Sequence, residues 1–175
     1  LLHGCAITPA RVNSAEQNFR AAAETKPFFE QAHGYAIFPS VGKAAVGLGG
    51  AFGNGVIYRE GTLVGEARVS ELSIGFALGG QSHSELIFFS DARALGEFCS
   101  GQFEFGANAS AVAITAGASA TAASSGVHAS ASSSPESARL AADYRKGMAV
   151  FTLTQGGLMY EAAIAGQKFA ADCRL

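Results

Sequence analysis

The sequence of 175 residues is poor in charge and contains no tryptophan. Charged residues make up 15% of it, against about 25% in an average globular protein. The formal net charge is −2, so the chain as a whole has no basic field that would attract a polyanion. Nucleic acid is therefore not an expected partner. The length suits one domain with a full-sized hydrophobic core.

The sequence also lacks a long apolar run. No stretch is long and apolar enough to cross a bilayer as a helix. The longest uncharged stretch runs from Phe105 to Pro135 if His128 is not counted, and it is rich in Ser, Thr and Gly. Any contact with a membrane must therefore come from an anchor or from the protein surface.

Familiar catalytic and metal-binding motifs are missing as well. There is no G-x-S-x-G sequence around a nucleophilic serine and no C-x-x-C pair for zinc. Gly47 and Gly49 begin a dinucleotide-binding pattern, but Phe52 stands at its third glycine position. Two carboxylates from distant parts of the chain could still meet in space, although nothing in the sequence favours this. We therefore expect no enzymatic activity, no cofactor and no metal.

A short motif near the start of the chain concerns Cys5. The order Leu2-His3-Gly4-Cys5 resembles the end of a bacterial lipoprotein signal peptide, although His3 departs from the usual small residue. This motif predicts that residues 1–4 are removed and that the thiol of Cys5 carries a lipid anchor. The alternative is an ordinary free cysteine near a trimmed start.

The two other cysteines are Cys99 and Cys173. Lipidation of Cys5 would leave an even number of cysteines in an oxidising compartment, so a disulfide between Cys99 and Cys173 is possible. Such a bridge would join the C-terminal tail to the body of the domain. The alternative is two buried free thiols, which are common in proteins.

Helix signals occur in two regions. Ser14 and Gln17 fit a capping box, which predicts a helix over residues 14–25, and Pro27 can open a further turn that Gly34 would end. Ser90 and Asp91 predict the cap of a second helix over residues 92–99. The apolar side of the first helix is expected to face the core.

The rest of the chain has the shorter period of strands. The predicted strands cover residues 35–39, 46–53, 55–59, 63–69, 73–79, 85–89, 103–116, 148–153 and 158–164. The Ala/Ser tract over 118–136 could extend a strand or form a loop, and we favour a loop over 124–136. Helices and strands segregate along the chain. The expected fold is therefore α+β, with a mainly antiparallel, barrel- or sandwich-like sheet, an N-terminal helix and a second short helix.

Several motifs in order resemble those of the SYLF-domain family, bacterial branch. The resemblance covers residues 19–169 and is carried by residues 33–44, the glycines that follow them, and residues 73–81, 101–110, 146–156 and 157–169. Ala77 stands where the family usually has Gln, and the tract over 118–134 is longer than is typical. We therefore expect a single SYLF-like domain over residues 14–175. The motif at Cys5 predicts that a lipobox remnant and N-terminal tether precede it over 1–13.

For function, the resemblance implies phospholipid binding. Eukaryotic members of the family bind phosphoinositides and associate with actin, whereas bacterial members are mostly secreted proteins without a settled role. Lys43, Arg145 and Lys146 stand beside apolar strands and are our candidates for contact with lipid headgroups. The alternative is that these three residues are solvated charges at strand ends.

The sequence thus predicts a secreted lipoprotein of the bacterial cell envelope, anchored through Cys5, most simply in the outer membrane. Its expected partner is membrane phospholipid, reached through the anchor and by direct binding. The alternative is an envelope structural or host-interaction protein with no small-molecule ligand.

Overall fold

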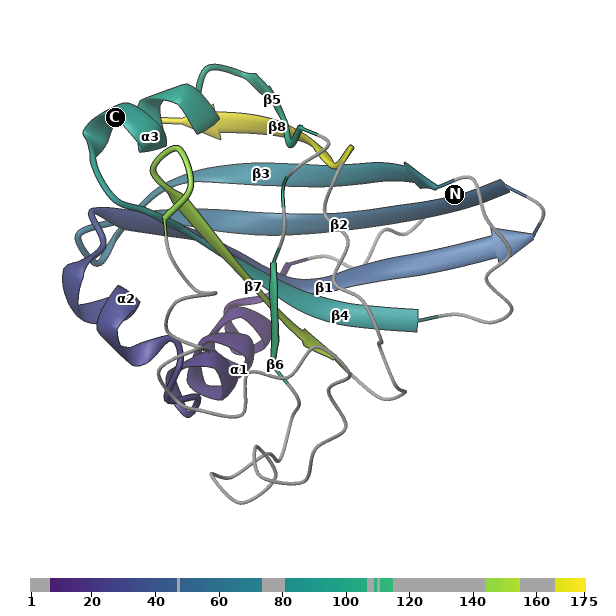
Figure 1. The fold of residues 1–175 in the computed structure, drawn as a ribbon, viewed down its shortest axis with the longest axis horizontal. Coiled ribbons are helices and arrows are strands. Elements are labelled where there is room, and N and C mark those ends of the chain that lie inside the picture. Colours follow the sequence, from purple (N-terminus) through teal and green to yellow (C-terminus); the bar gives the residue numbers. More distant parts are fainter. Residues whose placement is uncertain are drawn as a thin grey trace.

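The computed structural model describes residues 7–46, 48–73, 81–106, 109, 111–114, 144–154 and 166–175. Three helices and eight strands lie within them: α1 (Pro9–Arg20), α2 (Lys26–Gln31), β1 (Gly34–Val46), β2 (Leu48–Arg59), β3 (Thr62–Ser73), β4 (Gln81–Phe89), α3 (Ala92–Phe98), β5 (Gln102–Glu104), β6 (Val112–Ile114), β7 (Met148–Thr154) and β8 (Lys168–Cys173). The predicted α+β class, with its N-terminal helix, is confirmed (Figure 1).

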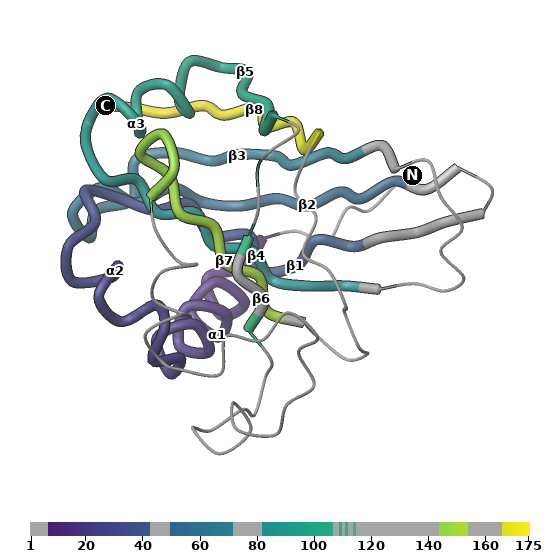
Figure 2. Tube along the Cα trace, in the orientation of Figure 1, coloured from purple at the N-terminus to yellow at the C-terminus, as the bar shows by residue number. Residues whose placement is uncertain are grey.

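All eight strands belong to one sheet in the order β5-β8-β3-β2-β1-β4-β7-β6. Every described pair is antiparallel except β6 with β7. The long strands β1, β2 and β3 run side by side, and the sheet curls into a half-barrel (Figure 2). Glu60 and Gly61 close the β2–β3 hairpin with positive φ of 49° and 81°, as expected for its turn.

The two faces of the sheet bury two separate cores, because successive strand residues point to opposite sides. Phe38 and Phe89 pack with α3 residues on one face, which we call the α3 face. Ile37 and Phe88 pack with α1 residues on the other, which we call the α1 face. Helices α1 and α2 lie together on one side of the sheet (Figure 1). Helix α3 lies near the sheet edge that β8 and β5 form (Figure 1).

Strand β1 is longer than predicted. The sequence places its end at Pro39, but the strand continues to Val46 through an irregularity between Ile37 and Ser40. Proline has no N–H to donate, so it is tolerated where the ladder is interrupted. Gly55 packs tightly against this segment, since a Cβ there would lie 2.7 Å from the Ile37 carbonyl oxygen.

Helix α1 begins earlier than the capping box predicts. Thr8 is the N-cap, and its side chain accepts a hydrogen bond from the Arg11 N–H at 3.3 Å, with Pro9 in the first turn. Ser14 therefore lies inside the helix. Val12 is buried, so part of the predicted tether packs on the domain. The threonine-proline pair provides both a cap and a preset φ, which explains the earlier start.

The predicted strand over 103–116 is wrong in one respect. Its two ends form β5 and β6, which lie at opposite edges of the sheet. Alternation of apolar residues shows that a segment is half-buried but does not show which strand it pairs with. Strand β8 was not predicted. The prediction for 158–164, most of that for 73–79, and the 118–136 tract lie outside the described residues.

Candidate functional site

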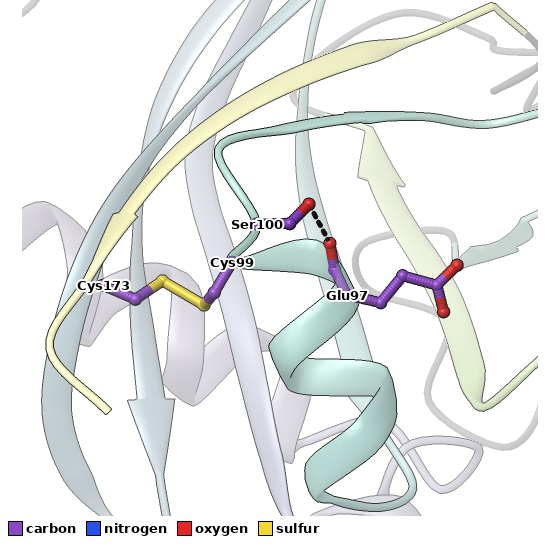
Figure 3. Close-up of a disulfide and its surroundings, with 4 residues drawn as sticks. All are labelled: Glu97, Cys99, Ser100 and Cys173. Carbon is purple, nitrogen blue, oxygen red and sulfur yellow. Dashed lines mark hydrogen bonds between the residues drawn. A yellow bond between two sulfur atoms is a disulfide. The ribbon is translucent and has the colours of Figure 1, made fainter.

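A disulfide joins Cys99, directly after α3, to Cys173, the last residue of β8. The sulfur–sulfur distance is 2.10 Å and the Cα atoms lie 5.7 Å apart. Figure 3 shows the bridge beside the Ser100 hydroxyl, which donates to the Glu97 carbonyl oxygen at 2.7 Å. The sequence left open whether these two cysteines pair or stay free, and in the structure they are paired. The bridge ties the C-terminal strand to the domain.

The predicted lipid-contact residues lie in different places. Cys5 is outside the described residues. The backbone of Lys43 lies in β1 opposite Gln81 of β4, while its side chain is outside what the structure describes. Arg145 and Lys146 are exposed and form the turn before Met148, which pairs with Phe89 at the other end of β4. At about 3.3 Å per residue, the two ends of β4 are about 26 Å apart.

The structure therefore brings Arg145 and Lys146 together and keeps Lys43 away from them. Arg93 of α3, which the sequence analysis did not single out, joins the first two. Its guanidinium donates to the Lys146 carbonyl oxygen at 3.4 Å and pairs with Glu97 at 3.0 Å. One headgroup cannot contact all three predicted cations at once.

No helix in the described part of the chain covers the α1 face where it lies across β2, β3 and β8 (Figure 1). Phe52 protrudes from it with 67% of its surface exposed, and its direct neighbours are Gly42 on β1 and Ser70 on β3. Lys168 continues the same row on β8, and Arg68 stands two residues from Ser70 on the same face. Both cations are exposed. We call Phe52, Arg68 and Lys168 the Phe52 surface.

Acidic residues border the Phe52 surface. Glu104 on β5 lies opposite Lys168 in the strand register, and Glu66 lies opposite Asp172 further along β3 and β8. Among the charged side chains that the structure describes on the α1 face, these two cations therefore lie nearest to Phe52 in the strand register. A phenylalanine in a strand normally indicates core, which is why the sequence analysis missed this surface. The small residues around Phe52 in the sequence were the one signal that could have indicated its exposure.

A buried polar cluster occupies one end of the α3 face. Its members are at most 8% exposed and come from β3, β4, β7 and the residue before β8: Glu71, His83, Glu85, Thr152 and Gln167. The amide nitrogen of Gln167 donates to Glu71 at 3.3 Å and to Glu85 at 3.1 Å. The His83 Nε2 atom lies 3.3 Å from the same Glu85 oxygen.

This cluster connects distant strands. Strands β8 and β3 lie on one side of the sheet order and β4 on the other, so the Gln167 bonds cross the concave side of the half-barrel. Among the described residues, no group of three or more His, Cys, Asp or Glu is placed to hold a metal ion. The expectation of no catalytic carboxylate pair rested on sequence alone, and the spatial meeting of Glu71 and Glu85 is a feature that sequence could not reveal.

A third group of polar residues lies on α1 and on the strand face that it contacts. Arg20 pairs with Glu16 at 2.8 Å, and its guanidinium carbon lies 4.1 Å from the centre of the Phe29 ring. Burial raises the pKa of Tyr35 to about 12, so its hydroxyl stays protonated at neutral pH. These contacts attach the helices to the α1 face.

The fold is thus an α+β half-barrel, and within the described residues no helix is long and apolar enough to cross a membrane. Residues 70–173 match the model of the Ysc84 (SYLF) family, described as Las17-binding protein actin regulator. The match covers more than half of the chain, which therefore belongs to this family. It confirms the resemblance found in the sequence.

The chain is also similar to Beta cell expansion factor A of Aeromonas veronii. The two are 27% identical over 157 residues, which cover 88% of this chain and 51% of that protein. The chain thus spans about half the length of this relative.

Proposed function

We propose that this chain is a phospholipid-binding protein of the bacterial cell envelope, whose Phe52 surface docks on anionic bilayers. The observation that carries the proposal is the 67% exposure of the Phe52 ring between small residues, with Arg68 and Lys168 beside it. Membership of the SYLF family supports a lipid ligand. The proposed role is binding rather than catalysis.

The expected strength of this contact is modest. Transfer of a phenylalanine side chain out of water is worth about 1.5–3 kcal/mol, and each cation near an anionic surface about 1 kcal/mol. The sum corresponds to dissociation constants in the millimolar to high micromolar range. Lys43, Arg145 and Lys146 could add long-range attraction from their separate positions. An anchor would then hold the protein at the membrane while the surface orients it.

The disulfide supports the proposed location, because such bonds persist in oxidising compartments such as the periplasm. We extend the proposal to a lipid anchor on Cys5, most simply in the outer membrane. Expressed with a native signal peptide, the protein should incorporate labelled palmitate and partition into detergent. The Cys5→Ser variant should do neither. Labelling that persists in this variant would exclude Cys5 as the lipidation site.

The Phe52 surface can be tested with one fluorescent probe, since the chain has no tryptophan. In unlipidated Cys5→Ser protein, the additional Phe52→Trp substitution should give emission that shifts to the blue on anionic vesicles and is quenched by brominated acyl chains. Leu63→Trp is the matched control: it is also exposed (57%) and lies about 23 Å along β3 from the residue paired with Phe52. Its emission should stay unchanged.

Vesicle flotation supplies the second measurement. Phe52→Ala and the Arg68→Ala/Lys168→Ala pair should each weaken flotation severalfold, and rising salt should weaken it further because the Debye length falls from about 10 Å at 0.1 M to about 3 Å at 1 M. Loss of binding only on replacing Lys43, Arg145 and Lys146 would move the contact to those residues. No flotation on any headgroup would favour the alternative of an envelope structural or host-interaction protein.

A further inference from the structure

The buried polar cluster on the α3 face has more hydrogen-bond acceptors than donors. Both hydrogens of the Gln167 amide nitrogen are used by Glu71 and Glu85. Three oxygens find no hydrogen-bond partner among the residues that the structure describes: Glu85 Oε1, Thr152 Oγ1 and Gln167 Oε1. Their side chains are 0%, 2% and 1% exposed. Buried polar atoms of native proteins are nearly always satisfied, so these three indicate a missing donor.

Rearranging the side chains does not remove the shortage. If the Gln167 amide were turned over, its oxygen would face two carboxylates, which accept hydrogen bonds when ionised. Glu85 would then lose its 3.1 Å donor. The orientation in the structure is therefore the favourable one. The Thr152 hydroxyl also carries one O–H donor, but it can satisfy only one of the two other oxygens. At least one donor must therefore come from outside this set of side chains.

The three oxygens belong to neighbouring side chains. Glu85 and Thr152 are directly paired across β4 and β7, which places their Cβ atoms about 4.5–5.5 Å apart. Both point to the α3 face, since Ile87 and Val150, each two residues away, belong to its core. Gln167 reaches the same carboxylate from the opposite side of the half-barrel. One of the three oxygens thus belongs to the buried Glu85 carboxylate, and the other two belong to side chains next to it.

We propose that this cluster binds a small primary ammonium ion. An R–NH3⁺ group carries a positive charge and three N–H donors and has no acceptor, which complements a carboxylate oxygen, an amide oxygen and a hydroxyl oxygen. A metal ion fits less well, because no three metal-binding side chains converge among the described residues. A free amine and the ethanolamine headgroup of a phospholipid share the required chemistry. The inference does not depend on the Phe52 surface.

Thermal unfolding of the intact chain tests this inference. Methylammonium and ethanolammonium chloride should raise the unfolding temperature in a saturable way, by about 5 °C or more at about one hundred times Kd. Sodium chloride and tetramethylammonium chloride at the same ionic strength should not, because neither ion has an N–H donor. An equal rise with tetramethylammonium, or no saturable rise with either amine, would mean that water alone satisfies the cluster and would overturn the inference.

Variants locate the effect. Glu85→Gln should abolish the amine-dependent rise, whereas Glu66→Gln, at an exposed carboxylate on the α1 face of β3, should preserve it. Thr152→Val removes an unpartnered hydroxyl without changing shape, so it should unfold at the same or a higher temperature without amine and yet show a smaller amine-dependent rise. If Glu85→Gln does not fold, Thr152→Val alone still tests the site, because a smaller amine-dependent rise in a variant of equal or higher stability cannot come from a folding defect. An unaltered rise in Thr152→Val would contradict the site.

The source of the ammonium group is distinguished by flotation. The unlipidated Phe52→Ala variant is used, so that the Phe52 surface contributes little. Preferential flotation on phosphatidylethanolamine over phosphatidylcholine vesicles, reduced by free ethanolamine, would assign the headgroup. An amine-dependent rise in unfolding temperature without this preference would assign a free amine.

Discussion

Replacing Phe88 by alanine is expected to lower the free energy of unfolding by about 3–5 kcal/mol. The Phe88 ring is fully buried on the α1 face. It lies 4.9 Å from the centre of the Phe29 ring and 5.7 Å from that of Phe151, so it links α2 to β4 and β7. Truncation would remove this packing and leave a cavity that the rigid sheet cannot fill. Urea unfolding followed by circular dichroism measures the loss.

Phe52→Ala is the matched control for Phe88→Ala. It removes the same side chain from a strand of the same sheet, but at a position that is 67% exposed. The free energy of unfolding should change by no more than about 0.5 kcal/mol. Equal losses for the two variants would contradict the assignment of Phe88 to the core and of Phe52 to the surface. A small loss for Phe52→Ala also allows its effect on lipid binding to be interpreted without a folding defect.

Removing the disulfide should have the second large effect. The Cys99→Ser/Cys173→Ser variant is expected to lose about 2–5 kcal/mol of unfolding free energy, because the bridge joins residues 74 positions apart and restricts the unfolded chain. The bridge also holds β8, which carries Lys168 of the Phe52 surface and follows Gln167 of the buried cluster. Urea unfolding with and without dithiothreitol provides the measurement.

Reduction supplies the control for this second prediction. Wild-type protein in dithiothreitol should approach the stability of the double serine variant, and that variant should not respond to reduction. Cys5→Ser should leave the wild-type midpoint unchanged in both conditions. If dithiothreitol does not change the urea midpoint of the wild-type protein, the bridge contributes nothing to stability.

Local signals in the sequence were sufficient for much of the fold. Asp91 caps α3 through a 2.8 Å hydrogen bond from the Ala94 N–H, as its position before an apolar helix predicts. The turn at Glu60 and Gly61 separates β2 from β3 where expected. Such features depend on a few adjacent residues. The start of α1 was misplaced because Thr8 and Ser14 both carry cap signals, and the proline after Thr8 favours the earlier one.

The candidate sites could be predicted much less well. Lys43 and Arg145 were grouped because both stand beside apolar strands, but pairing along β4 separates them. Phe52 lies in the strand predicted over 46–53, but the sequence does not show that no helix of the described structure covers that part of the sheet (Figure 1). Glu71, Glu85 and Gln167 are far apart in the chain and meet only because the sheet curls.

The sequence by itself therefore determined the α+β class, the family, the main hairpins and two cysteines able to pair, because each depends on local pattern, motif order or count. Only the tertiary structure decided which strands form the edges, which apolar ring stays in water and which polar groups share one interior. Alternation assigns a residue to a face, but strand order and curvature decide what lies opposite that face. These long-range pairings leave the Phe52 surface exposed to solvent and place the buried polar cluster in the interior.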